Sequence, residues 1–347
     1  MFMMPAMPLS KAKGPRAETM SRVRTIQVAG DEAGMRVDRW FKHRYPDLGH
    51  GRVQKLLRTG QVRVEGRRVK SGTRLEEGQT IRIPPLGEPP VKTEKSKPVL
   101  SKADVRDLKA RVLYKDKDII AINKPPGLAV QGGSGLRRHL DGMTEALRFG
   151  AAEKPRLVHR LDKDTSGVLV LARSAAAARE LTRAFRSKKI RKLYWAVVAG
   201  VPRPSAGVVD LALAKLPSRR GERVVAGARE GKKALTHYRL LDRAGGKAAW
   251  VAFEPLTGRT HQLRVHAVAL GTPILGDGKY GGREAFIKGV DIAARLHLHA
   301  RAMRIPLPGG DIDITAPLSD HMLETFKALG FDDRQYHDFF FDINNLV

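Results

Sequence analysis

Residues 159–172 read HRLDKDTSGVLVLA and join a polar loop to an apolar strand. The loop concentrates a histidine, an arginine, two aspartates and two hydroxyls, whereas Gly167 to Ala172 is continuously apolar. A short apolar run that follows a turn signal predicts a strand buried on both faces. Because loops held by rigid strands often carry binding and catalytic groups, the polar loop is a candidate functional site.

Other stretches predict further strands around this one. They fall at residues 112–114, 119–122, 194–198, 207–213, 235–241 and 249–253, with a Gly245-Gly246 turn between the last two. One predicted helix is capped by Ser174 and runs to about Lys188, and another runs from about His261 to Leu270. Strands dominate and do not alternate strictly with helices. We therefore predict an α+β domain over residues 110–330, with a mixed, largely antiparallel sheet and flanking helices.

Residues 23–85 predict a separate, small α/β domain. Apolar residues at helical spacing predict helices around residues 37–41 and 53–57, and a hairpin follows with its turn at Gly66. Basic residues gather on the second helix and the hairpin: Arg52, Lys55, Arg58, Arg63, Arg67 and Arg68. A solvated helix face is the alternative, but the pooling of these charges favours a phosphate-binding surface.

The segments outside these domains differ from them in composition. Residues 1–22 are rich in methionine and basic residues but lack a continuous apolar run, so we expect a disordered basic tail. Residues 86–109 are rich in proline and charge, which is typical of a linker. Residues 331–347 form an acidic, aromatic C-terminal tail that we expect to pack on the preceding domain.

The whole chain is strongly basic. It carries 64 Lys and Arg residues against 36 Asp and Glu residues, which gives a formal net charge of +28. A polyanion is the expected partner, because each neutralised phosphate releases condensed counterions, and nucleic acid is the leading candidate. A charge that serves only solubility is the alternative. No apolar run is long enough to span a bilayer, so we expect no membrane partner.

The residue types and motif spacings that the sequence lacks argue against several kinds of metal, redox and nucleotide-binding site. The chain has no cysteine, which removes disulfides, cysteine-ligated zinc, iron–sulfur clusters and cysteine nucleophiles. His261 and His266 are five positions apart and miss the i, i+4 spacing of a helical metal site. The glycine-rich run at 132–135 lacks the ending of a nucleotide-binding P-loop. We expect no metal.

The stretch TGRTHQLRVH forms a second polar cluster. Thr260 is placed to cap the helix, which leaves Arg264 one turn inside it. The Arg264 guanidinium either pairs with a carboxylate or binds phosphate. From the residues alone, a turn best explains Asp164 and core packing best explains Tyr194, while the role of Asp162 stays open.

These clusters together carry a resemblance to a known family. The set of matching motifs consists of HRLDKDTSG at 159–167, NKPPGL at 123–128, Lys192 with Tyr194, GRTHQLRVH at 258–266, Gly276-Asp277 and Tyr280-Gly281. Over about residues 112–320 the chain resembles the RluA family of pseudouridine synthases. Residues 23–85 resemble the S4 RNA-binding domain that is often fused ahead of this catalytic domain. Residues 130–136 and 221–225 resemble the branch of the family that modifies 23S rRNA.

The resemblance implies an isomerisation that needs no cofactor. The N1–C1′ bond of a uridine is cut, the uracil turns, and its C5 is joined to C1′. Asp162 would be the essential carboxylate, either as a nucleophile at the sugar or as a base at the ribose 2′ position. Arg264 would be its salt-bridge partner, and Tyr194 would lie beside the uracil.

The resemblance also implies base flipping. A uridine must leave its stack to reach the carboxylate, at a cost of roughly a few kcal/mol. Arg160 resembles the residue proposed to occupy the vacated space, Leu263 would pack under the ring, and His159 belongs to the same substrate-binding motif. RNA contacts by the small domain and the basic catalytic face would offset this cost.

Several functional alternatives follow from the same residues. We expect a cytoplasmic monomer that acts on 23S rRNA or on a precursor of the large ribosomal subunit. A tRNA-directed or dual-specificity enzyme is one alternative. A non-catalytic RNA-binding assembly factor is another, and the intact Asp162, Tyr194 and Arg264 set argues against it. A glycosidase that pairs Asp162 with Asp164 is disfavoured by the basic charge of the chain.

Overall fold

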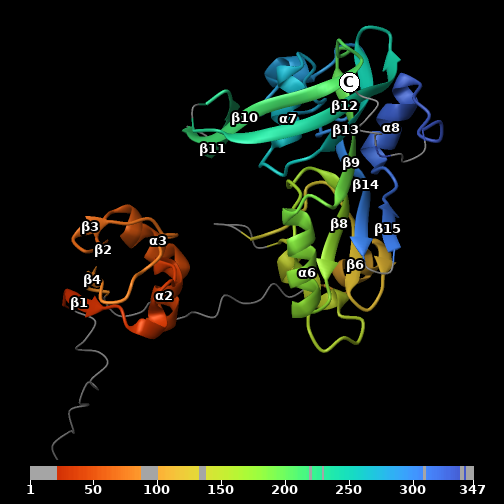
Figure 1. Ribbon diagram of the computed structural model, residues 1–347. Coiled ribbons are helices and arrows are strands. Elements are labelled where there is room, and N and C mark those ends of the chain that lie inside the picture. The colour runs from red at the N-terminus through yellow and green to blue at the C-terminus, as the bar shows by residue number, and fades with distance from the viewer. Residues whose placement is uncertain are drawn as a thin grey trace, which may run out of the picture. The chain divides into compact units, whose positions relative to one another are not determined.

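The computed structural model describes residues 22–86, 101–132, 138–218, 221–228, 230–307, 310–336 and 340. The chain divides into two compact units, Met1–Ser96 and Lys97–Val347 (Figure 1). The predicted disordered tail, apart from Arg22, lies outside the described residues. No described helix has the length and apolar character needed to cross a membrane.

The first unit contains a four-stranded sheet with two packed helices. Its elements are β1 (Arg24–Gln27), η1 (Gly30–Glu32), α2 (Val37–Arg44), α3 (His50–Arg58), β2 (Arg63–Val64), β3 (Arg67–Arg68) and β4 (Thr80–Ile83). The strand order is β1-β4-β2-β3. Trp40 and Phe41 on α2 and Val53 and Leu57 on α3 share one buried core, so the apolar spacing in the sequence does mark the inner helix faces.

The second unit is built on one large mixed sheet. Its strands are β5 (Val112–Lys115), β6 (Ile119–Lys124), β7 (Arg156–Leu157), β8 (Ser166–Ala172), β9 (Arg191–Ala199), β10 (Ala206–Ser218), β11 (Gly221–Ala226), β12 (Lys232–Ala244), β13 (Ala248–Pro255), β14 (Leu298–Leu307) and β15 (Gly310–Thr315). The order is β11-β10-β12-β13-β9-β14-β8-β6-β5, with β15 on β14 and β7 on β8. Among the described strands only β14 and β8 pair in parallel. The predicted mixed, largely antiparallel sheet is therefore confirmed.

Helices flank this sheet. They are α4 (Lys102–Ala110), α5 (Leu140–Met143), η2 (Thr144–Leu147), α6 (Ala175–Arg186), α7 (Gln262–Ala269), η3 (Gly282–Ala285) and α8 (Asp320–Leu329). Figure 1 shows α6 beside β8 and α8 beside β13, while α7 lies near β10 and β12. The Ser174 hydroxyl accepts a hydrogen bond from the Ala177 amide, so Ser174 caps α6 as predicted.

The linker prediction is wrong at its C-terminal end. Residues 102–110 form α4, whereas residues 87–100 lie outside the described residues. Ser101 and Asp104 form a capping box at the start of α4. Leu108 buries its side chain in the core of the second unit, to which α4 belongs. A composition of mixed charges hides this helix, because only one of its residues is fully buried.

The C-terminal tail packs on the second unit where it is described. Phe331 joins a buried cluster with Trp195, Trp250 and Phe326. Phe340 packs partly against the same cluster and lies 4.9 Å from the Arg191 guanidinium. These contacts agree with the expectation that the aromatic tail lies on the domain.

The junction between the polar loop and β8 admits only glycine. Gly167 has φ of +105°, and a Cβ atom there would lie 2.2 Å from the Ala300 carbonyl oxygen on β14. The hydroxyl of the neighbouring Ser166 lies 2.8 Å from Nδ1 of His299, which is also on β14. These contacts bring β14 against the start of β8 and set the direction in which the loop leaves the sheet.

We predict that Gly167→Ala destabilises the protein by about 3–5 kcal/mol. The substitution combines a strained positive φ with overpacking against backbone atoms that cannot move away. Urea unfolding followed by circular dichroism measures the effect. Gly246→Ala is the matched control, since nothing lies within 4 Å of its added Cβ. Equal stability of the two variants would contradict the prediction.

Candidate active site

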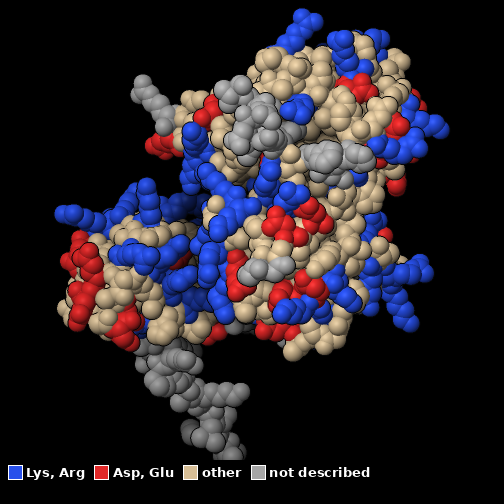
Figure 2. All heavy atoms as spheres, turned by 45° about the vertical axis from the view of Figure 1, so that its right-hand side comes forward, with Lys and Arg blue, Asp and Glu red and all other residues tan. Residues whose placement is uncertain are grey.

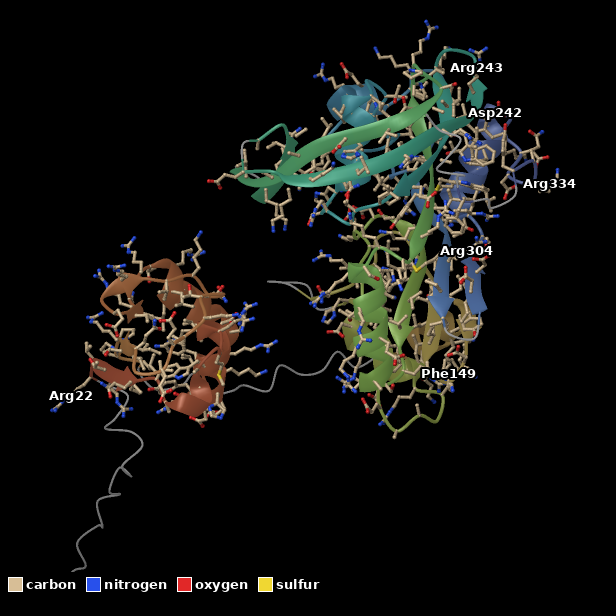
Figure 3. All side chains as sticks on the ribbon, in the orientation of Figure 1. Arg22, Phe149, Asp242, Arg243, Arg304 and Arg334 are labelled. Carbon is tan, nitrogen blue, oxygen red and sulfur yellow. The ribbon has the colours of Figure 1, made fainter. Side chains whose placement is uncertain are left out.

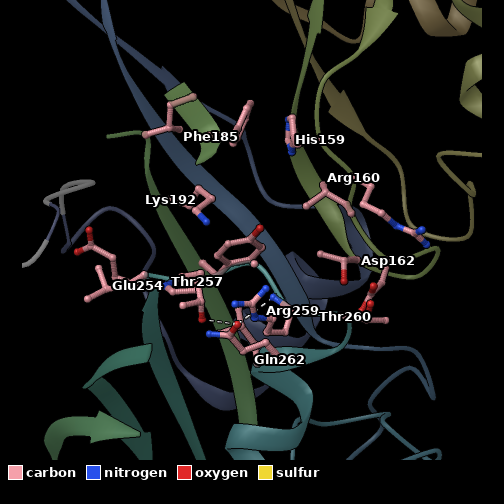
Figure 4. A pocket seen from close by; sticks show the side chains of 18 of the residues that line it. His159, Arg160, Asp162, Phe185, Lys192, Glu254, Thr257, Arg259, Thr260 and Gln262 are labelled. Carbon is pink, nitrogen blue, oxygen red and sulfur yellow. Dashed lines mark hydrogen bonds between the residues drawn. The ribbon is translucent and has the colours of Figure 1, made fainter. Parts of the chain in front are cut away.

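The polar loop and the TGRTHQLRVH stretch face each other across one cleft of about 590 Å³ (Figure 4). Its walls come from the loop before β8, the end of α6, the start of β9, and the segment from β13 into α7. Asp162, Arg160, Tyr194, Leu263, Arg264 and His159 all line it. The six catalytic and substrate-binding residues predicted from the sequence therefore lie in a single cavity.

Asp162 lies in the loop with 19% of its side chain exposed. Its Oδ2 atom is 3.9 Å from Arg264 Nη1 and 3.8 Å from His261 Nε2. The carboxylate thus faces a cation and an imidazole in a partly dehydrated space. Such a group can act on a ligand atom in the cleft while its charge is stabilised from one side.

A buried lysine holds the loop that carries Asp162. Lys124 Nζ donates hydrogen bonds to the carbonyl oxygens of Pro125, Leu128 and Lys163, at 2.8, 2.9 and 2.9 Å. The Gly127 amide donates a further bond of 2.9 Å to the Lys163 carbonyl. Burial lowers the pKa of Lys124 to about 7, although nearby aspartates oppose that shift. The NKPPGL element therefore braces the loop beside Asp162 rather than lining the cleft.

Arg264 has a closer partner than the one expected. Its guanidinium makes hydrogen bonds of 2.7 and 2.6 Å to both Asp277 oxygens, whereas Asp162 lies at the longer distance of 3.9 Å. Burial alone would lower the pKa of Arg264, but the hydrogen bonds and charge of Asp277 raise it. Asp277 thus fixes a permanently charged arginine, and Arg264 then faces Asp162 with its remaining donors.

The prediction that Thr260 caps α7 is wrong. His261 occupies the N-cap position with φ of +53°, and no side chain caps the helix there. The side-chain oxygen of Gln262 instead accepts hydrogen bonds from the Thr257 hydroxyl and from the backbone N–H of Arg259. This arrangement closes the turn before α7 and leaves the backbone of His261 in a left-handed conformation, which residues other than glycine rarely adopt.

The left-handed conformation directs His261 toward Asp162. The Val224 amide donates to the Tyr280 hydroxyl at 3.2 Å, and this hydroxyl lies 2.6 Å from His261 Nδ1. The other ring nitrogen, Nε2, is the one that faces Asp162. Burial lowers the pKa of His261, while the charge of Asp162 opposes the shift. His261 was not among the predicted site residues.

Tyr194 and Leu263 form the apolar part of the cleft. Tyr194 projects from β9 and belongs to the same apolar cluster as Leu263 on α7. Burial raises the pKa of Tyr194, and the charge of Asp162 raises it further. The phenol therefore stays protonated at neutral pH and presents a ring against which a planar ligand can stack.

His159 and Arg160 lie at the loop end of the cleft. His159 Nε2 accepts a hydrogen bond of 2.8 Å from the Val170 amide, and its ring stacks on Phe185. Burial lowers the pKa of His159, so the ring stays neutral and supports the wall. Arg160 is exposed, and Figure 4 shows it on the same side of the cleft as Asp162.

The remaining predicted residues lie elsewhere. Asp164 is exposed and does not line the cleft, so the structure does not bring it into a carboxylate pair with Asp162. The basic residues of the first unit lie on its surface: Arg52, Lys55, Arg58, Arg63, Arg67 and Arg68. Figure 2 shows Lys and Arg side chains over much of the visible face of the molecule. Within the described ranges, no group of His, Asp and Glu has the arrangement of a metal site.

Asp277 belongs to the Gly276-Asp277 element quoted above, but the sequence analysis did not predict it as the partner of Arg264. It follows Gly276, whose φ is +73° and whose added Cβ would lie 1.7 Å from the Arg295 carbonyl oxygen. The signal in the sequence is a single carboxylate after a glycine at the end of an apolar stretch. A buried carboxylate requires a cation, and Arg264 meets that requirement.

We predict that Asp277→Ala destabilises the protein by about 3–5 kcal/mol, because it leaves Arg264 as an unpaired buried charge. Asp313→Ala removes a similar bidentate pair, with Arg304 (Figure 3), from a half-exposed site and should cost about 1 kcal/mol or less. Urea unfolding of both variants tests the difference. Similar losses would show that the Arg264 pair has no special weight.

Comparison with known proteins assigns the chain to a family. Residues 118–269 match the family model described as RNA pseudouridylate synthase. The chain is 38% identical over 321 residues to ribosomal large subunit pseudouridine synthase C of Salmonella typhi, covering 90% of this chain and 98% of the relative. The protein of that name from Escherichia coli strain K12 is 38% identical over 322 residues, with the same coverage of 90% and 98%. The structure of human RNA pseudouridylate synthase domain containing 4 is 31% identical with a TM-score of 0.55, covering 65% of this chain and 95% of that one. This chain therefore belongs to the RNA pseudouridylate synthase family, the enzymes that isomerise uridine to pseudouridine in RNA.

Proposed function

We propose that this protein isomerises specific uridines of 23S rRNA to pseudouridine, with Asp162 as the essential carboxylate. The observation that carries the proposal is a carboxylate in a strongly basic cleft. Seven basic side chains line the cleft against two carboxylates, Asp162 and Glu254. The seven are Arg160, Arg186, Lys188, Arg191, Lys192, Arg259 and Arg264. The names of the relatives support the large-subunit rRNA as the substrate.

The chemistry asks for one ionised carboxylate and no cofactor. The N1–C1′ bond breaks, a C5–C1′ bond forms, C5 loses its proton and N1 gains one, so the atoms balance. Asp162 begins this exchange as a nucleophile at the sugar or as a base at the ribose 2′ position. Arg264, held by Asp277, stabilises the ionised form without rearranging during the reaction.

The apolar side of the cleft would receive the flipped uracil. Tyr194 offers its ring for stacking, and Leu263 packs on the same surface. Arg160 is free to leave the protein surface and fill the gap that the uridine vacates in the RNA. Contacts to the RNA backbone offset the cost of unstacking, which is roughly a few kcal/mol.

The first unit would supply much of the RNA affinity. Its six surface cations form no ion pair within the described part of the chain. Together with the two-helix and hairpin arrangement, they support an S4-like RNA-binding domain. We further infer a cytoplasmic monomer, since the six predicted site residues already meet within a single chain and rRNA is the proposed substrate.

We predict that cells with Asp162→Asn lose the same pseudouridines as a deletion strain. The amide preserves the shape of the side chain but removes its charge and its basicity. Carbodiimide treatment followed by reverse transcription of total RNA maps the modified positions. Loss of 23S rRNA stops in both strains supports the proposal.

Other outcomes of this mapping would point elsewhere. An unchanged rRNA map with lost tRNA stops would keep the reaction and replace the substrate. Stops lost only in the deletion strain would remove Asp162 from the chemistry. No change in either strain would favour an RNA-binding assembly factor.

We predict that replacing Arg63, Arg67 and Arg68 with alanine weakens RNA binding without lowering the maximal rate. Each lost phosphate contact should reduce the slope of log affinity against log salt by about 0.7–0.9. Filter binding of a 23S rRNA transcript at several salt concentrations measures both quantities. Lys327→Ala on α8 is the control, because this lysine is exposed and lies outside the cleft. An unchanged slope in the triple variant would exclude the hairpin from the RNA contact.

A further inference from the structure

Lys192 is a lysine in the cleft whose charge has no partner in direct contact. It lies on β9 two residues before Tyr194, so both side chains leave the same face of the strand, about 7 Å apart. Figure 4 shows Lys192 reaching into the space that Asp162 enters from the opposite side. In the part of the chain that the structure describes, its ammonium makes no hydrogen bond or ion pair.

The surroundings of Lys192 make an unpaired charge costly. Burial lowers the pKa of Lys192 to about 8, with the charge of Glu254 opposing the shift. Glu254, however, is bound by Arg191 through hydrogen bonds of 2.6 and 2.8 Å. Glu254 therefore binds Arg191 directly, and among the described residues no carboxylate is in direct contact with Lys192. A partly buried cation of this kind is stabilised when an anion joins it.

Other cations continue from this point along the cleft wall. Arg186 ends α6, Lys188 lies in the turn before β9, and both line the same cavity as Lys192. The opposite wall instead holds Asp162 with its own partners, Arg264 and His261. The cleft thus has one side that acts on the nucleotide and one side on which the cations outnumber the single carboxylate, Glu254. RNA supplies anions only as backbone phosphates.

We propose that Lys192 binds the phosphate group of the nucleotide whose uracil stacks on Tyr194. This inference rests on the proposed function, and it adds a substrate-positioning residue to it. The phosphate would complete the ion pair that Glu254 leaves open. It would also anchor the flipped nucleotide on the β9 side of the cleft, opposite Asp162, in the ground state and the transition state alike.

The experiment uses the full chain and a 23S rRNA transcript that carries tritium at C5 of uridine. Tritium release reports the loss of the C5 proton, and filter binding across salt concentrations reports phosphate contacts. Lys192→Met removes the charge at similar volume, and Lys192→Arg keeps it. Lys327→Met is the matched control, since Lys327 is exposed on α8. Lys192→Gln serves as a second neutral variant if the methionine protein folds poorly.

We expect Lys192→Met to raise the half-saturating RNA concentration about tenfold, with a maximal rate within about threefold of wild type. Its salt slope should fall by about 0.7–0.9, the value of one phosphate contact. Lys192→Arg should restore affinity and slope, whereas Lys327→Met should change neither. This pattern separates phosphate binding from a merely structural role. If Lys192 only supported the fold, the charge kept in Lys192→Arg would not restore the affinity and the salt slope.

Two results would overturn the inference while leaving the proposed function intact. An active wild type with an unchanged slope in both neutral variants would show that Lys192 meets no phosphate. A loss of maximal rate at unchanged half-saturation would make Lys192 a proton-transfer group instead. Absence of tritium release from the wild type would count against the proposed function, and the binding arm would still decide whether Lys192 contacts RNA.

Discussion

The buried ion pair between Arg264 and Asp277 is the interaction on which the cleft depends. Its two hydrogen bonds of 2.6 and 2.7 Å satisfy two groups that lie almost entirely out of water. Because either charge alone would be strongly destabilising there, α7 and the loop that carries Asp277 have to fold against each other. Asp162 therefore meets an arginine whose position and charge are already set before any RNA arrives.

The opposite side of the cleft is held by contacts to the backbone. Lys124 binds the Lys163 carbonyl, and Gly167 allows β14 to approach the start of β8. Asp162 directly precedes Lys163, so the bond from Lys124 holds the backbone next to the carboxylate. Preorganisation of this kind lets fixed protein groups stabilise charge in the cleft without rearranging. The surrounding cations then match the polyanionic substrate of the family.

Local rules predicted elements well where neighbours decide the outcome. The apolar run of β8, the Ser174 cap of α6 and the glycine turn before β13 all depend on residues close in the chain. The same rules missed α4, whose charged sequence buries one side chain fully. They also placed the α7 cap at Thr260, because they take no account of the hydrogen bonds by which the Gln262 side chain closes the preceding turn.

The chemical inventory follows from the order of residues alone: an aspartate, a tyrosine and an arginine in motifs that resemble one family, on a chain with a net charge of +28. The sheet-rich fold class also follows from it, because periodicity and turn residues act over a few positions. The partner of each charge, in contrast, depends on the folded arrangement of the whole unit. Arg264 takes Asp277, 13 residues away, and Lys124 takes a carbonyl 39 residues away. Burial imposes these pairings, and burial depends on how distant segments pack together.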